Sequence, residues 1–170
     1  VWRDVQIGAT VINTSLTKAE TAELQRLAAG KDVLEVGSAY GYSTVALALV
    51  ANTVDAVDPH QAHISYGHLV SNLAANDLRD KVTIDVGWSQ NVLSMLHDQG
   101  WMCDLVWVDG DHTADVVTHD VQWALKLLRL GGVLACHDHG EVTCPGVAAA
   151  LDAWRPYDYK VDTLAVYRQP

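Results

Sequence analysis

Basic side chains are scarce in this sequence. Eleven Lys and Arg residues stand against twenty-one Asp and Glu residues, which gives a formal net charge of −10 at pH 7. A nucleic-acid-binding protein normally presents a basic face, and too few cations are present to build one. The same charge disfavours binding to an anionic membrane surface. We therefore expect no nucleic-acid partner and no membrane partner.

Long apolar runs and paired cysteines are also lacking. The longest unbroken apolar run is Val45–Ala51, far short of the roughly 20 residues that cross a bilayer. No leader with basic and then apolar residues opens the sequence. The three cysteines are odd in number and have no CxxC spacing, which argues against a disulfide scaffold and favours a reducing, cytoplasmic compartment.

The residues that are present favour one globular α/β domain over 1–170. Hydrophobic residues make up 49% of the chain and charged residues 19%, a balance that disordered chains do not have. Short apolar runs alternate with longer amphipathic stretches, which is typical of βαβ units. Strands are predicted over 33–36, 54–57, 82–86, 105–108, 133–136, 157–161 and 164–167. Helices are predicted from the capping box at Thr17 and Glu20 to Gly30, and over 42–51, 61–75, 91–99, 114–129 and 146–154.

This order predicts a doubly wound, mostly parallel seven-stranded sheet that ends in an antiparallel hairpin. Residues 1–16 are predicted to be irregular or partly helical and to form an N-terminal lid. In such sheets, ligands bind beyond the carboxyl ends of the strands. The loops at those ends cover residues 37–43, 58–60, 87–90, 109–113 and 137–146.

The first of these loops has two glycines, Gly37 and Gly41, which let a ligand approach the backbone closely. Their spacing does not fit the dinucleotide fingerprint G-x-G-x-x-G. Glu35, at the strand end, would repel a pyrophosphate but would tolerate a ligand with an ammonium group. Asp58 ends the next strand, where an acid hydrogen-bonds a ribose diol in related folds. The alternative for Asp58 is a helix cap or a turn with Pro59.

The segment from Glu35-Val36-Gly37 to Gly41-Tyr42-Ser43 resembles motif I of class I S-adenosylmethionine-dependent methyltransferases. It is most similar to the loop of the catechol and caffeoyl-CoA O-methyltransferases. Gly87-Trp88-Ser89-Gln90 is similar to the adenine-binding Gly-x-Ser-Gln stretch of the catechol enzymes. The resemblance covers about residues 33–138 and implies a Rossmann-like methyltransferase fold with S-adenosyl-L-methionine as the cofactor.

The resemblance also implies a set of cofactor contacts. The two glycines would pass under the methionine part, and Ser43 would bind its carboxylate. Ser38 would be a further cofactor-binding residue of this loop. Glu35 would order the loop and lie near the methionine ammonium. The ribose and adenine contacts would come from Asp58, Ser89 and Gln90. Trp88 is interpreted as a packing residue, and Ser89 has the alternative of capping the next helix.

A second group of polar residues follows the fourth and fifth strands. Asp109-Gly110-Asp111-His112 leaves one strand and His137-Asp138-His139 the other, so these side chains should be near neighbours. Carboxylates that lie close together cost free energy unless a cation lies between them. A divalent metal is therefore expected, although Asp111 is better explained as a helix cap. A zinc site of Cys136, His139 and Cys144 is an alternative with irregular spacing.

This part resembles the metal-dependent small-molecule O-methyltransferases, including those that act on macrolide sugars. Asp109 and Asp138 match their metal ligands, whereas His137 stands where the catechol enzymes have an aspartate. Three residues past the metal aspartate, the catechol enzymes have a basic lysine. His112 takes that position here and is the expected general base. The resemblance implies Mg²⁺ or Mn²⁺ held by Asp109, His137 and Asp138.

The predicted function is methyl transfer from S-adenosyl-L-methionine to a hydroxyl of a small molecule, with help from a divalent metal. The expected partners are a small hydroxylated acceptor and, if the acceptor pocket is shared between subunits, a second copy of the chain. Three alternatives stay open: a non-catalytic cofactor-binding module, a nicotinamide-dependent oxidoreductase, and a hydroxylase built on the same ligand set.

Overall fold

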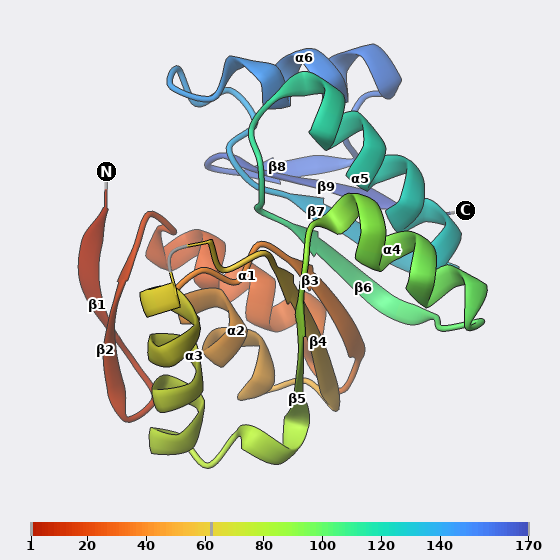
Figure 1. Cartoon of the computed structure of the whole chain (residues 1–170). Coiled ribbons are helices and arrows are strands. Elements are labelled where there is room, and N and C mark those ends of the chain that lie inside the picture. The colour runs from red at the N-terminus through yellow and green to blue at the C-terminus, as the bar shows by residue number, and fades with distance from the viewer. Residues whose placement is uncertain (1, 62, 170) are drawn as a thin grey trace.

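A seven-stranded sheet runs through the protein with helices on both faces, and a separate two-stranded hairpin lies beside it (Figure 1). The computed structural model describes residues 2–61 and 63–169. The strands are β1 Arg3–Ile7, β2 Thr10–Thr14, β3 Asp32–Val36, β4 Thr53–Asp58, β5 Val82–Val86, β6 Cys103–Val108, β7 Leu128–Cys136, β8 Tyr159–Val161 and β9 Leu164–Arg168. The helices are α1 Lys18–Ala28, α2 Tyr42–Ala48, α3 His63–Ala75, α4 Ser89–Asp98, α5 Ala114–Leu127 and α6 Pro145–Trp154, with a 3₁₀ turn η1 at Arg79–Lys81.

The strand order in the large sheet is β5-β4-β3-β6-β7-β9-β8. Strands β3 to β7 pair in parallel, and β9 pairs antiparallel with both β7 and β8. The chain moves outward from β3 to β5 and then returns to the other side of β3, so the strand order reverses between β3 and β6. Such a switch point opens a crevice at the carboxyl ends of the strands. The predicted fold class is confirmed.

Two apolar layers hold the helices against the sheet. Because successive strand side chains point to opposite faces, Leu34 of β3 packs in the layer with α4, α5 and α6, and Val33 packs in the layer with α1, α2 and α3. Trp107 of β6 belongs to the second layer and is fully buried. The central strands are thus covered on both faces, which fixes their carboxyl ends in position.

The N-terminal segment differs from its prediction. Residues 1–16 were expected to be irregular or partly helical, but β1 and β2 form an antiparallel hairpin with Ile7 opposite Thr10. Gly8 has a φ of 54° in the intervening turn, a backbone conformation that glycine adopts readily. Ile12 points into the core, whereas Val11 is exposed. Buried and exposed side chains alternate here, as they do in a β-strand, and not with the spacing of a helix.

The other elements lie close to their predicted bounds. β7 begins at Leu128, five residues before the prediction, and includes the glycine pair that was predicted to be a turn. The capping box of α1 is present, with Thr17 and Glu20 bonded to each other's backbone. Predicted residue 62 of the third helix lies outside the described residues. Within the described chain, no helix has the length and apolar character that crossing a bilayer requires.

Candidate functional site

A cavity of about 960 Å³ opens at the carboxyl ends of the parallel strands. All five loops that the sequence marked contribute side chains or backbone to its wall. The N-terminal hairpin and the segment that follows it close another side through Trp2, Arg3 and residues 13–17. We call this space the strand-end cavity. Its position matches the ligand crevice of open α/β sheets.

The loop after β3 passes so close to the end of β6 that it requires glycine. Gly37 has a φ of 94°, and a Cβ atom there would lie 2.2 Å from the carbonyl oxygen of Asp109. Gly41 begins α2 with a φ of 92° and supplies no side-chain cap. Gly37, Ser38 and Ser43 line the strand-end cavity, whereas a Cβ atom at Gly41 would meet the side chain of Leu69 in α3.

Asp58 fastens this loop to the end of β4. One carboxylate oxygen, Oδ2, accepts hydrogen bonds from the backbone N–H groups of Ser38 at 3.1 Å and Ala39 at 2.9 Å. The other oxygen accepts from the backbone N–H of His60 at 2.7 Å. The side chain is 15% exposed and lines the cavity. Asp58 is therefore both a loop clamp and an acceptor that faces the cavity.

Glu35 lies beneath the loop rather than on the cavity wall. Its carboxyl group is fully buried and accepts hydrogen bonds from the hydroxyls of Ser43 and Thr44 at the start of α2. Burial raises the pKa of Glu35 to about 8, and the charges of Asp109 and Asp58 add to this effect. The predicted loop-ordering role fits this geometry. The side chain is not part of the cavity lining, and its place near a methionine ammonium stays a prediction.

The loop after β5 gives a mixed result. Ser89 begins α4, is buried and lines the cavity, whereas Gln90 is half-buried and is not part of the lining. The Ser89 hydroxyl is 3.4 Å from the Gln90 Oε1 atom. Trp88 was interpreted as a packing residue, but it is 46% exposed and lines the cavity. An aromatic ring at this place offers a flat apolar surface to a ligand.

The predicted metal ligands come together around His137. Its Nδ1 atom lies 3.2 Å from Oδ1 of Asp109 and 3.3 Å from Oδ1 of Asp138. The three ligand atoms lie within 4.8 Å of one another, as a metal site requires. Two carboxylates and one imidazole form a donor set that fits a divalent cation. If a metal is bound, these three residues would hold it.

Without a metal, the carboxylates of this group favour the protonated, positively charged forms of the neighbouring histidines. His137 is almost fully buried, and burial alone would lower its pKa, but the nearby carboxylates of Asp109, Asp138 and Glu20 raise the pKa to about 12. The same pairing with His112 and His137 holds the pKa of Asp138 well below its usual range. Metal binding must therefore release the proton from the His137 Nδ1 atom.

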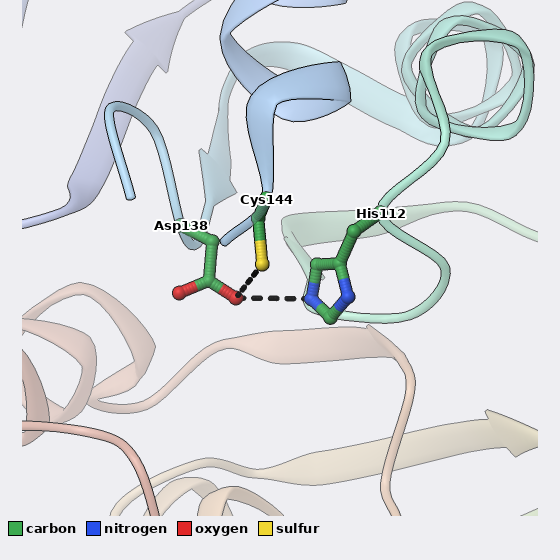
Figure 2. A group of neighbouring side chains, drawn as sticks. All are labelled: His112, Asp138 and Cys144. Atoms are coloured by element: carbon green, nitrogen blue, oxygen red, sulfur yellow. Dashed lines mark hydrogen bonds and ion pairs between the residues drawn. The ribbon is translucent and has the colours of Figure 1, made fainter. Parts of the chain in front are cut away.

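His112 approaches the other oxygen of Asp138. Its Nε2 atom lies 2.9 Å from Oδ2 of Asp138 (Figure 2). The same atom lies 3.9 Å from Oδ1 of Asp109. The carboxylates of Asp109 and Asp138 raise the pKa of His112 to about 10. The imidazole is therefore protonated at pH 7 in the metal-free protein, which the predicted role as a neutral base did not foresee.

Cys144 lies beside His112 and Asp138, and the three residues form a second group of possible metal ligands. Its Sγ atom lies 3.7 Å from Oδ2 of Asp138 (Figure 2), and the ligand atoms of His112, Asp138 and Cys144 lie within 4.8 Å of one another. The alternative zinc site is not formed, because its members have other contacts. His139 bonds Asp152 at 2.9 Å, and Cys136 is buried in the strand layer.

Glu20 is the residue that the sequence analysis missed. It was predicted only as part of the α1 capping box, yet its Oε2 atom also lies 3.4 Å from Nε2 of His137. Its Oε1 atom accepts from the backbone N–H and the hydroxyl of Thr163. These hydrogen bonds outweigh burial and lower the pKa of Glu20 to about 2. A buried carboxylate thus lies directly behind the predicted metal ligand His137.

Comparison with known protein families shows to which family this chain belongs. A family described as "Methyltransferase domain" matches residues 34–139. The chain belongs to this family. The match begins within β3 and ends just after β7, so it includes the loops after β3, β4, β5 and β6 and the first residues of the loop after β7. No curated protein sequence gives a significant match.

Solved structures share the fold of this methyltransferase domain. The O-methyltransferase from Bacillus cereus, solved in complex with SAH, is 20% identical and aligns with a TM-score of 0.71 over 82% of this chain and 70% of that chain. The O-methyltransferase TomG from Streptomyces achromogenes, involved in tomaymycin synthesis and solved with SAM, is 22% identical. It aligns with a TM-score of 0.73 over 92% of this chain and 82% of its own.

Proposed function

We propose that this methyltransferase domain transfers a methyl group from S-adenosyl-L-methionine to a hydroxyl of a small molecule, assisted by a divalent metal. The single observation that carries the proposal is the convergence of the five strand-end loops on one cavity. The structural neighbours named above were solved as O-methyltransferases with SAH or SAM, which supports this choice of cofactor and acceptor atom.

The wall of the cavity suits such a cofactor. Asp58 has lone pairs toward the cavity that can accept from a ribose diol, and Ser89 with Trp88 offers a hydroxyl and a ring for the adenine. Ser43 donates its hydroxyl to Glu35, so a bound carboxylate would need the backbone N–H groups at the start of α2. Gln90 would have to turn toward the cavity to reach the adenine.

The reaction asks two things of the protein. An acceptor oxygen must lie in line with the methyl carbon, and its proton must leave as the new bond forms and the carbon–sulfur bond breaks. A divalent ion, when bound, would lower the pKa of the acceptor hydroxyl and orient it. Asp109, His137 and Asp138 would hold that ion beside the cofactor loop.

His112 would then receive the proton. Its side chain is 43% exposed and reaches the strand-end cavity next to Asp138. In the metal-free protein, Asp109 and Asp138 hold a proton on His112. A cation on these carboxylates would offset their negative charge and leave the imidazole free to act as a base.

The test is methyl transfer from labelled S-adenosyl-L-methionine to a panel of catechols, phenols and sugars. We expect labelled product with Mn²⁺ and a large loss of product when EDTA replaces the metal. His112→Ala should reduce turnover and leave cofactor affinity unchanged, and His97→Ala on the far end of α4 serves as its control. Tight SAH binding without transfer to any acceptor would instead support a non-catalytic module.

A further inference from the structure

His137 is held from both sides by groups that accept hydrogen bonds. Glu20 lies on the Nε2 side at 3.4 Å, and Asp109 and Asp138 lie on the Nδ1 side at 3.2 and 3.3 Å. The His137 side chain is only 2% exposed and the Glu20 side chain 1%. The ring of Trp107 packs beside the imidazole, with 5.6 Å between the ring centroids. The imidazole therefore has little room to rotate.

Glu20 can act only as an acceptor toward His137. Its Oε1 atom receives two hydrogen bonds from Thr163, and its Oε2 atom receives one from the backbone of Thr17 at 2.8 Å. A carboxylate so placed keeps the hydrogen of a neutral imidazole on Nε2. The lone pair of Nδ1 then points at the space between Asp109 and Asp138. Sites in which a carboxylate orients a ligating histidine owe part of their metal affinity to that carboxylate.

We propose that Glu20 is a positioning residue that holds His137 as an Nδ1 ligand, so that the site prefers transition metal ions over Mg²⁺. This inference rests on the metal part of the proposed function. Mg²⁺ favours an all-oxygen shell, whereas imidazole nitrogen suits the later first-row metals. His137 makes this site different from one built of carboxylates alone. Glu20 fixes which nitrogen of His137 faces the metal.

Glu20→Gln tests this assignment. If the glutamine keeps its oxygen toward Thr163, its NH₂ group faces Nε2 of His137 and forces the ring hydrogen onto Nδ1. We expect the affinity for Co²⁺ and Zn²⁺ to fall about 10- to 100-fold, measured by calorimetry on EDTA-treated protein without cofactor. Glu23→Gln makes the same chemical change on the same helix, where Glu23 bonds Arg26 and Tyr159, and should leave both affinities unchanged.

The wild-type protein and a second variant test the metal preference. Wild type should bind Co²⁺ and Zn²⁺ at least tenfold more tightly than Mg²⁺. The double variant Glu20→Gln/His137→Asp supplies a third carboxylate with a neutral neighbour and should shift the preference toward Mg²⁺. Equal Mg²⁺ and Co²⁺ affinities in wild type, or equal losses in Glu20→Gln and Glu23→Gln, would overturn the proposal.

A measurement on wild type covers the case in which Glu20→Gln does not fold. In the Zn²⁺ complex, nitrogen-15 NMR of the histidine rings should show His137 with its hydrogen on Nε2 and the metal on Nδ1, assigned by loss of the signal in His137→Gln. The reverse arrangement contradicts the proposal. If no metal binds, the inference and the metal part of the function both fail, and methyl transfer that persists in EDTA would leave the methyltransferase assignment intact.

Discussion

Asp58 binds its own backbone as well as facing the strand-end cavity. Its three hydrogen bonds come from Ser38, Ala39 and His60, and hydrogen bonds to a charged group contribute about 1.5–3 kcal/mol each in favourable cases. Sequence reasoning predicts that Asp58→Ala weakens cofactor binding and spares folding. The structure changes the second half of this prediction, because the variant also releases the first loop.

We therefore expect Asp58→Ala to lower the free energy of unfolding by about 2 kcal/mol and to weaken SAH binding at least tenfold. Chemical denaturation and calorimetry measure the two effects. Asp80→Ala is the control, since Asp80 is exposed in η1 and away from the cavity. Unchanged SAH affinity in Asp58→Ala would remove the ribose assignment.

Glu35 is expected to make the free energy of unfolding depend on pH. Its pKa is raised from 4.5 to about 8 in the folded state, so between these values the folded protein keeps a proton that the unfolded chain has lost. Stability from this group therefore falls as pH rises from 4.5 to 8, by up to about 1.4 kcal/mol per pH unit. It is constant below and above that window.

Glu35→Gln removes the titrating group and keeps a polar partner for Ser43 and Thr44. Denaturation curves at pH 5, 6, 7 and 8 should fall less steeply with pH in this variant than in wild type. Parallel curves for the two proteins would show that the carboxyl group is already ionised in the folded state at pH 5.

At the scale of elements, the central sheet was predictable because its strands are buried on both faces. Runs such as Val33–Val36 and Leu105–Val108 have no polar face except at their carboxyl ends, so their positions and the loops after them follow from the sequence. The β1–β2 hairpin has a weak signal, because its turn at Gly8-Ala9 lacks the residue pairs typical of tight hairpins. Its strands also pack against the core through only some of their side chains.

The contact between Glu20 and His137 could not be predicted, because 117 residues separate them. The capping box already gave Glu20 a role at the start of α1. The sequence therefore held no sign that Glu20 had a second role near His137. The raised pKa of His112 has this origin only in part. Its largest cause is Asp109 in the same loop, whereas Asp138, whose Oδ2 atom lies 2.9 Å from Nε2 of His112, comes from the loop after β7.

The turn between β3 and α2 provides a test at this scale. Gly37→Ala places a Cβ atom 2.2 Å from the Asp109 carbonyl oxygen and forces an alanine to a φ of 94°. We expect a loss of more than about 1 kcal/mol of stability and weaker SAH binding, because the loop must move away from β6. Thermal unfolding and calorimetry report both.

Gly67→Ala is the matched control for this substitution. Gly67 lies within α3, and a Cβ atom there meets nothing within 4 Å, so alanine should stabilise the helix by about 0.5–1 kcal/mol. If both glycine variants behave alike, the close approach of the loop to β6 does not matter for stability.

At the scale of the whole molecule, the strand-end cavity joins parts of the chain that are distant in sequence. Its wall combines the N-terminal hairpin, the ends of β3, β4, β6 and β7, and the loop before α6. A ligand that fills this space bridges both halves of the sheet across the switch point between β3 and β6. Ligand binding should therefore stabilise the fold as a unit rather than one loop.

SAH at one hundred times its dissociation constant should stabilise the folded state by about 2.7 kcal/mol. For a chain of this length each kcal/mol raises the Tm by about 2–4 °C, so a shift of about 5–11 °C is expected in a thermal unfolding experiment.

NAD at the same concentration should give no shift, because the loop after β3 lacks the dinucleotide glycine pattern and the cavity wall carries several carboxylates that repel a pyrophosphate. A larger shift with NAD than with SAH would favour the oxidoreductase alternative over the methyltransferase. Asp58→Ala should lose most of the SAH shift, which separates binding in the strand-end cavity from binding elsewhere on the protein.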